Sequence, residues 1–360
     1  MLYWTQNTTF FGKGADRMRK SAFGFSVRGE ATALYTFENK NGMVMAVTDF
    51  GATLQSLLVP TAEGPLDVVL GYDDPIGYEG PAGTFFGATV GRNANRIGGG
   101  IFSLNGKTYT LRQNNGPNNL HSGPDSYSFR LWQVKSVTDN AITFSLHSPD
   151  GDQGFPGALD VEVTYTLTKE NAIRIDYLAT PRADTPVNLT NHSYFNLNGH
   201  DSGSVLGHTL RLDADFYTPV DQSLIPTGEI TPVAGTPMDF RTPKTLGRDI
   251  GQDFEPLIFG SGYDHNWCLH TLGEFRKIAT LTGEKSGLSM DVSTDRPGVQ
   301  VYTGNFIFEE PGKSGVTYRH RPGICFETQH YPDAVNHPNF PSPIVRSGEI
   351  YRTTTEFRFR

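Results

Sequence analysis

The stretch ALDVEVTYTLT, residues 158 to 168, decides the fold class of this chain. Its apolar side chains alternate with polar ones, in the order Leu159, Asp160, Val161, Glu162, Val163, Thr164, Tyr165, Thr166, Leu167 and Thr168. Successive side chains of a β-strand point to opposite faces, so this period of two gives one apolar and one polar face. The stretch therefore predicts a strand that lies half-buried on a sheet.

The alternating pattern recurs along most of the chain. Further runs of this kind are GMVMAVTDF, LQSLLVP, AITFSLHS, AIRIDYLA, HTLRLDADFY, GVQVYTGNF and IYRTTTEFRF. Turn-forming pairs separate many of the runs, at Asn41-Gly42, Asn105-Gly106, Asp150-Gly151 and Asn198-Gly199. No window of about 12 residues shows a convincing helical period with caps. We therefore predict an all-β chain that forms an antiparallel sandwich or barrel with few short helices.

Composition disfavours several classes of partner. The 360 residues carry a formal net charge of −8 and contain no block rich in Lys and Arg, so neither nucleic acid nor an anionic membrane is expected as a partner. No run approaches about 18 consecutive apolar residues, which argues against a membrane span. The cysteines, Cys268 and Cys325, are too few for a disulfide framework, and the first residues do not resemble a secretory signal. We expect a cytoplasmic protein that binds a neutral polar ligand.

Domain organisation follows from length and from the lack of linkers. Length alone would suggest two domains, but β-sandwiches often exceed about 200 residues as one unit. No fixed-period repeat or low-complexity linker is found, and the Pro/Thr-rich part from Thr218 to Pro243 is interpreted as long loops over one sandwich. We predict an N-terminal extension of uncertain order over residues 1–30 and a single β-sandwich domain over residues 31–360.

One carboxylate stands inside an apolar run of GICFETQHYPDAVNHPNFP, residues 323 to 341. If the run is extended, Ile324 and Phe326 point to one face, and Cys325, Glu327 and Gln329 point to the other. Burying a charge costs several kcal/mol unless the charge is used or neutralised. Glu327 is therefore a candidate functional residue, and a carboxylate paired with a nearby Arg is the alternative.

Other polar segments favour a site that forms hydrogen bonds with the hydroxyl groups of a ligand. In NHSYFNLNG, residues 191 to 199, alternation puts His192, Tyr194 and Asn196 on one face. Further candidates are Asn95 and Arg96 in GRNANRI, His121 in NNGPNNLHSG, Asp264 in YDHNW, and Gln300 and Tyr302 in GVQVYTGNF. Such side chains suit a sugar, because each of its hydroxyls both donates and accepts hydrogen bonds.

Other kinds of chemistry find less support in the sequence. There is no G-x-S-x-G nucleophile elbow and no Walker-type loop. No H-E-x-x-H pair occurs, and the pair His330 and His337 lies in a Pro-rich loop that makes a poor metal site. Nothing near the two cysteines argues for a reactive thiol, so both are interpreted as small buried hydrophobes.

With these motifs assembled, the chain resembles the aldose 1-epimerase (galactose mutarotase) family. The matching segments, in the family's order, are VTDFGATLQSLLVP, DVVLGYD, FFGATVGRNANRI, NNGPNNLHSG, GDQGFPG, NHSYFNLNG, VDQSLIPTGEI, MDFRTP, YDHNW, GVQVYTGNF and FETQHYPDAVNHPNFP. They extend from about Tyr35 to Phe359, and one departure is Ser122, where the family more often has Gly. The resemblance implies a large antiparallel β-sandwich of the galactose mutarotase-like supersandwich type, with a wide cleft across one sheet.

The resemblance also implies the roles of the site residues. The family's base falls on Glu327 and its acid on His192, while His121 matches the second histidine at the sugar ring. Asp264 matches the carboxylate that binds sugar hydroxyls. Further sugar-binding positions fall on Asn95, Arg96 and Gln300. The implied partner is a small aldose, no metal or nucleotide cofactor is required, and the chain is expected to be a monomer or a homodimer.

Interconversion of anomers requires that a base take the proton of the C1 hydroxyl while an acid protonates the ring oxygen. We expect the nearby carboxylates Glu327 and Asp264 to raise the pKa of His192 and keep it a competent acid. Two alternatives stay open: a non-catalytic sugar-binding module, and an epimerase of hexose phosphates. The second would need an Arg/Lys cluster for the phosphate, and Arg96 alone supports it weakly.

Overall fold

A computed structural model describes residues 9–11, 17–80, 84–271 and 273–360. Within these ranges the largest sheet has nine strands, in the order β12 (Gln133–Val137), β13 (Ala141–Ser148), β14 (Leu159–Leu167), β15 (Ala172–Pro181), β31 (Tyr351–Phe359), β25 (Ser289–Thr294), β24 (Arg276–Thr282), β19 (Thr209–Leu212) and β22 (Lys244–Thr245). Neighbouring strands pair antiparallel throughout this sheet.

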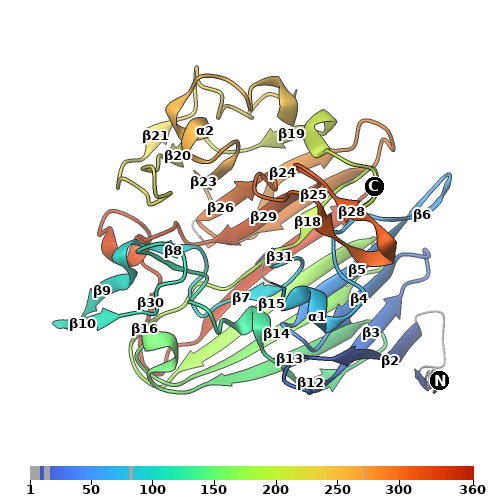
Figure 1. Cartoon of the computed structure of the whole chain (residues 1–360), viewed down its shortest axis with the longest axis horizontal. Helices are drawn as coiled ribbons and strands as arrows, with labels where there is room; N and C mark the ends of the chain where they lie inside the picture. The colour runs from blue at the N-terminus through green and yellow to red at the C-terminus, as the bar shows by residue number, and fades with distance from the viewer. Residues whose placement is uncertain (1–8, 12–16, 81–83, 272) are drawn as a thin grey trace.

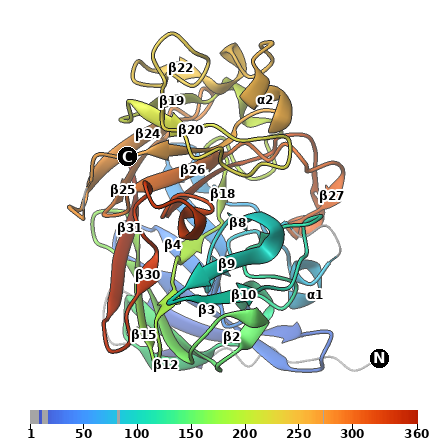
Figure 2. The ribbon, with the colours of Figure 1, turned by 90° about the vertical axis from the view of Figure 1, so that its left-hand side faces the viewer.

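Two further sheets of the described chain have six strands each. The N-terminal sheet runs in chain order through β1 (Thr9–Phe11), β2 (Arg17–Phe25), β3 (Ala31–Glu38), β4 (Val44–Thr48), β5 (Thr53–Thr61) and β6 (Gly64–Asp67). The other, called here the site sheet, has the order β18 (Tyr194–Phe195), β29 (Ile324–Gln329), β26 (Gly298–Tyr302), β23 (Asp264–Cys268), β20 (Phe216–Thr218) and β21 (Thr231–Pro232). Figures 1 and 2 show β20, β21 and α2 at one end of the molecule and the blue strands β2 and β3 at the other.

Short pairs and helices complete the described elements. The pairs join β10 (Lys107–Thr110) to β9 (Ile101–Leu104), β11 (Asn119–Leu120) to β8 (Arg96–Ile97), β16 (Thr185–Pro186) to β30 (Ile344–Val345), β17 (Thr190–Asn191) to β7 (Thr89–Val90), and β27 (Glu310–Pro311) to β28 (Thr317–Tyr318). The α-helices are α1 (Pro75–Tyr78) and α2 (Glu255–Phe259), and 3₁₀ turns lie at Gly98–Gly100, Tyr127–Phe129, Asp152–Gly154, Val205–Gly207, Leu246–Arg248, Lys313–Gly315 and Ala334–Asn336. No helix among the described residues is long and apolar enough to cross a membrane.

The main hydrophobic core lies where the two six-stranded sheets meet the nine-stranded one. One cluster of buried side chains takes Phe144, Tyr165 and Ile175 from the nine-stranded sheet, Phe37, Val47 and Leu54 from the N-terminal sheet, and Trp267, Val299 and Phe326 from the site sheet. Each sheet therefore buries one face in a common core, which is the predicted sandwich. The other face of the site sheet is left to build a site.

The decisive stretch forms β14, and its burial alternates as predicted, with Leu159, Val161, Val163, Tyr165 and Leu167 buried. Tyr165 also connects the core to the site. Its hydroxyl donates to the Ala52 carbonyl at 2.6 Å and accepts from the Asn191 amide at 3.1 Å, and Asn191 directly precedes His192. The Pro/Thr-rich part after Thr218 forms loops apart from the short β21, also as predicted.

The N-terminal expectation needs a correction. Residues 17–25 were expected to belong to an extension of uncertain order, but they form β2, which pairs with β3. The strand signal was weak because only Met18 and Phe23 of these nine residues are buried, and a register shift between Ala22 and Gly24 breaks their alternation. The rest of the predicted extension up to residue 16 lies outside the described residues, except for the short strand Thr9–Phe11.

Candidate active site

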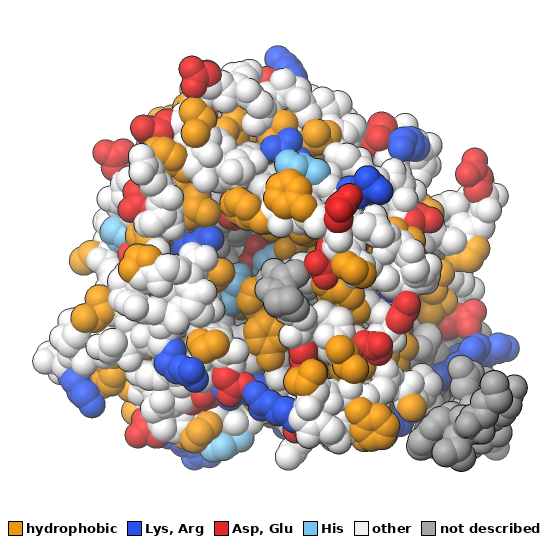
Figure 3. Space-filling view, viewed as in Figure 1, with side chains coloured by type: hydrophobic (Ala, Val, Ile, Leu, Met, Phe, Trp, Pro, Cys, Tyr) orange, Lys and Arg blue, Asp and Glu red, His pale blue; other side chains and the backbone are white. Residues whose placement is uncertain are grey.

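A cavity of about 730 Å³ opens on the free face of the site sheet. Six of the seven predicted site residues line it, namely Asn95, Arg96, His121, His192, Asp264 and Glu327. Figure 3 shows a hollow near the middle of this face, with histidine and acidic side chains inside it. Residues distant in sequence thus meet at one concave place, as a ligand site requires.

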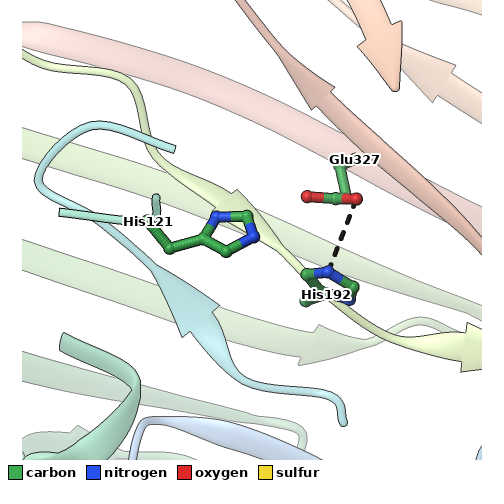
Figure 4. Close-up of side chains that lie close together, drawn as sticks. All are labelled: His121, His192 and Glu327. Atoms are coloured by element: carbon green, nitrogen blue, oxygen red, sulfur yellow. Dashed lines mark ion pairs between the residues drawn. The ribbon is translucent and has the colours of Figure 1, made fainter. Parts of the chain in front are cut away.

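Glu327 and His192 face each other in this cavity. The distance from Nε2 of His192 to Oε1 of Glu327 is 3.6 Å, and the two residues are 5% and 2% exposed, respectively. Figure 4 shows the imidazole and the carboxylate pointing toward one another, with the ring of His121 beside them. Oε2 of Glu327 has no hydrogen-bond partner among the described residues. One carboxylate oxygen is therefore free to accept a proton from a ligand.

The alternation of β29 turns Glu327 into the cavity. Ile324 and Phe326 join the main core, while Cys325 and Glu327 project from the opposite face, as the sequence predicts. The site does not show the alternative of a structural pair with an Arg, because no ion pair joins Glu327 to an Arg in the described chain. Its ion-pair partner is His192.

Backbone contacts and aromatic rings hold His192 in place. Its N–H donates to the Ala88 carbonyl at 2.9 Å, and its carbonyl accepts from the Gly87 N–H at 3.0 Å. Gly87 has φ +65°, and a Cβ there would lie 2.0 Å from the Leu54 carbonyl oxygen, so the close approach needs glycine. The imidazole is stacked between Phe85 and Tyr194, with ring centroids 5.8 and 5.0 Å away.

Burial shifts the two proton-carrying groups in opposite directions. It lowers the pKa of His192 to about 4, and the charge of Asp264 only partly opposes this. The expectation that neighbouring carboxylates raise the His192 pKa is therefore wrong, because loss of hydration outweighs their attraction. Burial, assisted by Asp264, raises the pKa of Glu327 well above its usual value. At a pH between these two pKa values, Glu327 and His192 together hold one proton.

His121 is held in one tautomer by Asn95, which lies opposite it just beyond the paired strands β8 and β11. The ring Nδ1 of His121 accepts a hydrogen bond from the Asn95 backbone N–H at 3.1 Å. The backbone N–H of His121 donates to the Asn95 carbonyl at 3.0 Å. A neutral imidazole whose Nδ1 accepts must carry its proton on Nε2. His121 therefore presents a hydrogen-bond donor, and adding a second proton at Nδ1 would break the contact with Asn95.

His121, His192 and Glu327 have ligand atoms within 4.8 Å of one another, a grouping of the kind that can hold a metal ion. The tautomer of His121 does not suit that use, because a metal-bound Nε2 must be free of its proton. Freeing Nε2 of His121 would require moving its proton to Nδ1, which already accepts a hydrogen bond from the Asn95 N–H. The residues as held here therefore fit a sugar hydroxyl better than a metal ion.

The loop that presents His121 includes Ser122, the position at which the chain departs from the family that it resembles. The Ser122 hydroxyl accepts from the Asn93 N–H at 2.8 Å and donates to the Asn93 carbonyl at 3.1 Å. It therefore ties the His121 loop to the segment that carries Asn95 and Arg96.

The remaining polar residues divide into cavity-lining and supporting groups. Arg96 lines the cavity, and its Nε donates to the Asn115 Oδ1 at 3.1 Å. Asp264 lines it too, and its Oδ1 accepts from the Gln300 Nε2 at 2.7 Å. Gln300 was predicted to bind the sugar, but it is not among the lining residues. It lies behind Asp264 and positions that carboxylate.

Asn196 was expected on the face of His192, but it does not line the cavity. Its amide donates to the carbonyls of Gly203 and Pro322, because the chain leaves the strand after Phe195 and the alternation ends there. Sequence reasoning did not single out other lining residues, among them Phe85, Asn115 and Glu310. Asn115 lies in a quoted motif and could have been considered, whereas Glu310 follows no recognisable pattern.

Comparison with known proteins gives consistent matches over most of the chain. A model of the aldose 1-epimerase family matches residues 33–358. Galactose mutarotase from Bos taurus is 46% identical over 315 residues, covering 87% of this chain and 90% of that protein. Aldose 1-epimerase from Escherichia coli K12 is 39% identical over 335 residues, covering 92% and 96%. The structure of an aldose epimerase homologue from C. elegans has TM-score 0.84 and 32% identity, covering 92% of this chain and 99% of that one.

Proposed function

The chain belongs to the aldose 1-epimerase family, and from this premise we propose that it interconverts the α- and β-anomers of free hexoses such as galactose and glucose. The family makes the chain an isomerase that acts on aldose sugars. The observation that supports the assignment of roles is the facing pair of Glu327 and His192, 3.6 Å apart at the base of an open cavity.

In the proposed mechanism Glu327 is the base and His192 the acid. Oε2 of Glu327 takes the proton of the C1 hydroxyl while His192 Nε2 gives its proton to the ring oxygen, so that the C1–ring oxygen bond breaks and an aldehyde forms. Rotation about C1–C2 and closure on the other face reverse both transfers. The pair begins and ends with one proton, so no proton is exchanged with solvent in a turnover.

The contacts of the two histidines favour His192 over His121 as the acid. An acid that cycles between imidazole and imidazolium must tolerate protons on both ring nitrogens. His121 cannot, because its Nδ1 accepts the Asn95 N–H. We assign His121 instead to donate its Nε2–H to a sugar oxygen. Asn95, Arg96 and Asp264 are assigned to form hydrogen bonds with the sugar hydroxyls.

Charge in the cavity disfavours the hexose-phosphate alternative. Among the described lining residues Arg96 is the only Arg or Lys, whereas three carboxylates line the cavity, on Asp264, Glu310 and Glu327. A phosphate normally requires several cationic or N–H donors. The complete acid and base pair likewise favours catalysis over a purely sugar-binding module.

Polarimetry tests the proposed function directly. Freshly dissolved α-galactose and α-glucose should reach their equilibrium rotation faster with the protein than in buffer alone, at a rate proportional to enzyme concentration. Galactose 6-phosphate is the control for the alternative and should react more slowly. Failure of the protein to accelerate mutarotation of either free hexose would contradict the proposal.

The shifted pKa values predict the pH dependence of the rate. Activity needs one proton on the pair, and the second proton binds only as the pH falls through about 4, where His192 titrates. The last proton is lost at the raised pKa of Glu327. Because His192 titrates near 4, we expect no inflection of the catalysed rate centred at about 6.5, the usual pKa of His. A decline centred there, after subtraction of the uncatalysed rate, would show that His192 titrates unshifted.

Cellular location and assembly remain predictions. Cys268 and Cys325 are free thiols, which is consistent with the proposed reducing, cytoplasmic environment. We also keep the prediction of a monomer or homodimer.

A further inference from the structure

The proposed mechanism leaves one buried group in contact with the acid unexplained, the thiol of Cys325. Its Sγ lies 3.5 Å from Nδ1 of His192, on the side of the ring away from Glu327. Cys325 is fully buried and does not line the cavity. It is the cross-strand neighbour of Tyr194 on β18 and of Tyr302 on β26, both of which line the cavity. The thiol therefore contacts the acid but lies outside the cavity.

We propose that Cys325 is a positioning residue that holds the His192 imidazole with Nε2 toward Glu327 and accommodates Nδ1 both with and without a proton. This inference rests on the proposed function, since it concerns the acid of that reaction. A thiol can donate its S–H to a bare Nδ1 or accept from Nδ1–H. A backbone carbonyl could only accept and a backbone N–H could only donate.

The two histidines show the consequence of that difference. The Asn95 N–H fixes His121 as a permanent Nε2–H donor. The thiol leaves His192 free to bind a proton at Nδ1 when it becomes the acid, and to keep that proton while Nε2 gives its own to the ring oxygen. Because burial raises the pKa of the Cys325 thiol well above its usual value, the group remains a neutral S–H and does not add a charge beside the imidazole.

Cysteine variants test the inference by steady-state polarimetry. We expect Cys325→Ala to lower kcat about tenfold with KM nearly unchanged, in the range for losing one buried hydrogen-bond partner. Cys325→Ser, whose hydroxyl also donates and accepts, should recover kcat to within about threefold of the wild type. Cys268→Ala is the matched control, because it removes the other buried thiol, which stands on β23 outside the lining residues, and should leave kcat unchanged.

Equal losses of kcat in Cys325→Ala and Cys325→Ser, or no loss in either, would overturn the inference while wild-type activity stands. Absence of wild-type mutarotation would instead overturn the proposed function. A ring ¹⁵N spectrum of His192 gives a second readout that does not depend on the Ala variant folding. The His192 Nδ1 resonance should differ between wild type and Cys325→Ser and should be the same in Cys268→Ala. An unchanged Nδ1 resonance in Cys325→Ser would show that the contact does not exist.

Discussion

Glu327→Gln is expected to abolish nearly all mutarotation while the protein folds normally. Removing a base that transfers a proton in the transition state typically costs a factor of about 10² to 10⁴ in rate. The amide has the shape of the carboxyl group but cannot accept the C1 hydroxyl proton. Stability should be retained, because glutamine nearly matches the carboxyl group in shape and brings no charge into this buried position. Polarimetry at saturating galactose and thermal unfolding of both proteins measure these two effects.

Glu310→Gln is the control for Glu327→Gln. Glu310 also lines the cavity, and its carboxylate accepts a hydrogen bond from the Tyr72 hydroxyl at 2.6 Å, a contact that an amide oxygen can keep. We expect its rate to stay within about threefold of wild type, as is usual when an uncharged isostere preserves the hydrogen bond. If Glu327→Gln kept more than about a tenth of the wild-type rate, its assignment as the base would be wrong, given the usual contribution of a general base.

His192→Gln is expected to cause a loss of similar size, about 10² to 10⁴ in kcat. A glutamine amide can donate a hydrogen bond to the ring oxygen, but it cannot transfer a proton to it. Since sugar binding is assigned to Asn95, Arg96, Asp264 and His121, KM should change much less than kcat. Initial rates over a range of galactose concentrations separate the two parameters.

The double variant Glu327→Gln/His192→Gln tests whether the two groups act as a unit. Proton removal at C1 and proton delivery to the ring oxygen belong to one step in the proposed mechanism, so the second substitution should cost little once the first is made. We expect the double variant to be about as slow as the slower single variant. Losses that multiply would mean that the two side chains act in independent steps.

Much of the site was predictable because strand alternation is a local property. The period of two in β29 places Glu327 opposite the core residues Ile324 and Phe326, and the structure confirms that placement. The same rule failed for Asn196, because β18 ends at Phe195 and hydrogen bonds to two carbonyls turn the side chain away. Alternation therefore predicts a face only as far as the strand continues.

The sequence by itself determined the strand pattern, the sandwich and the residues that meet in the site, because periodicity and motif order are written along the chain. The tertiary structure alone decided how those residues behave. The pKa of His192 falls and that of Glu327 rises because packing removes water from both, an effect that depends on depth and not on neighbours in sequence. The different capacities of His121 and His192 to carry a proton likewise come from what touches each Nδ1, a backbone N–H in one case and a thiol from a strand more than a hundred residues away in the other.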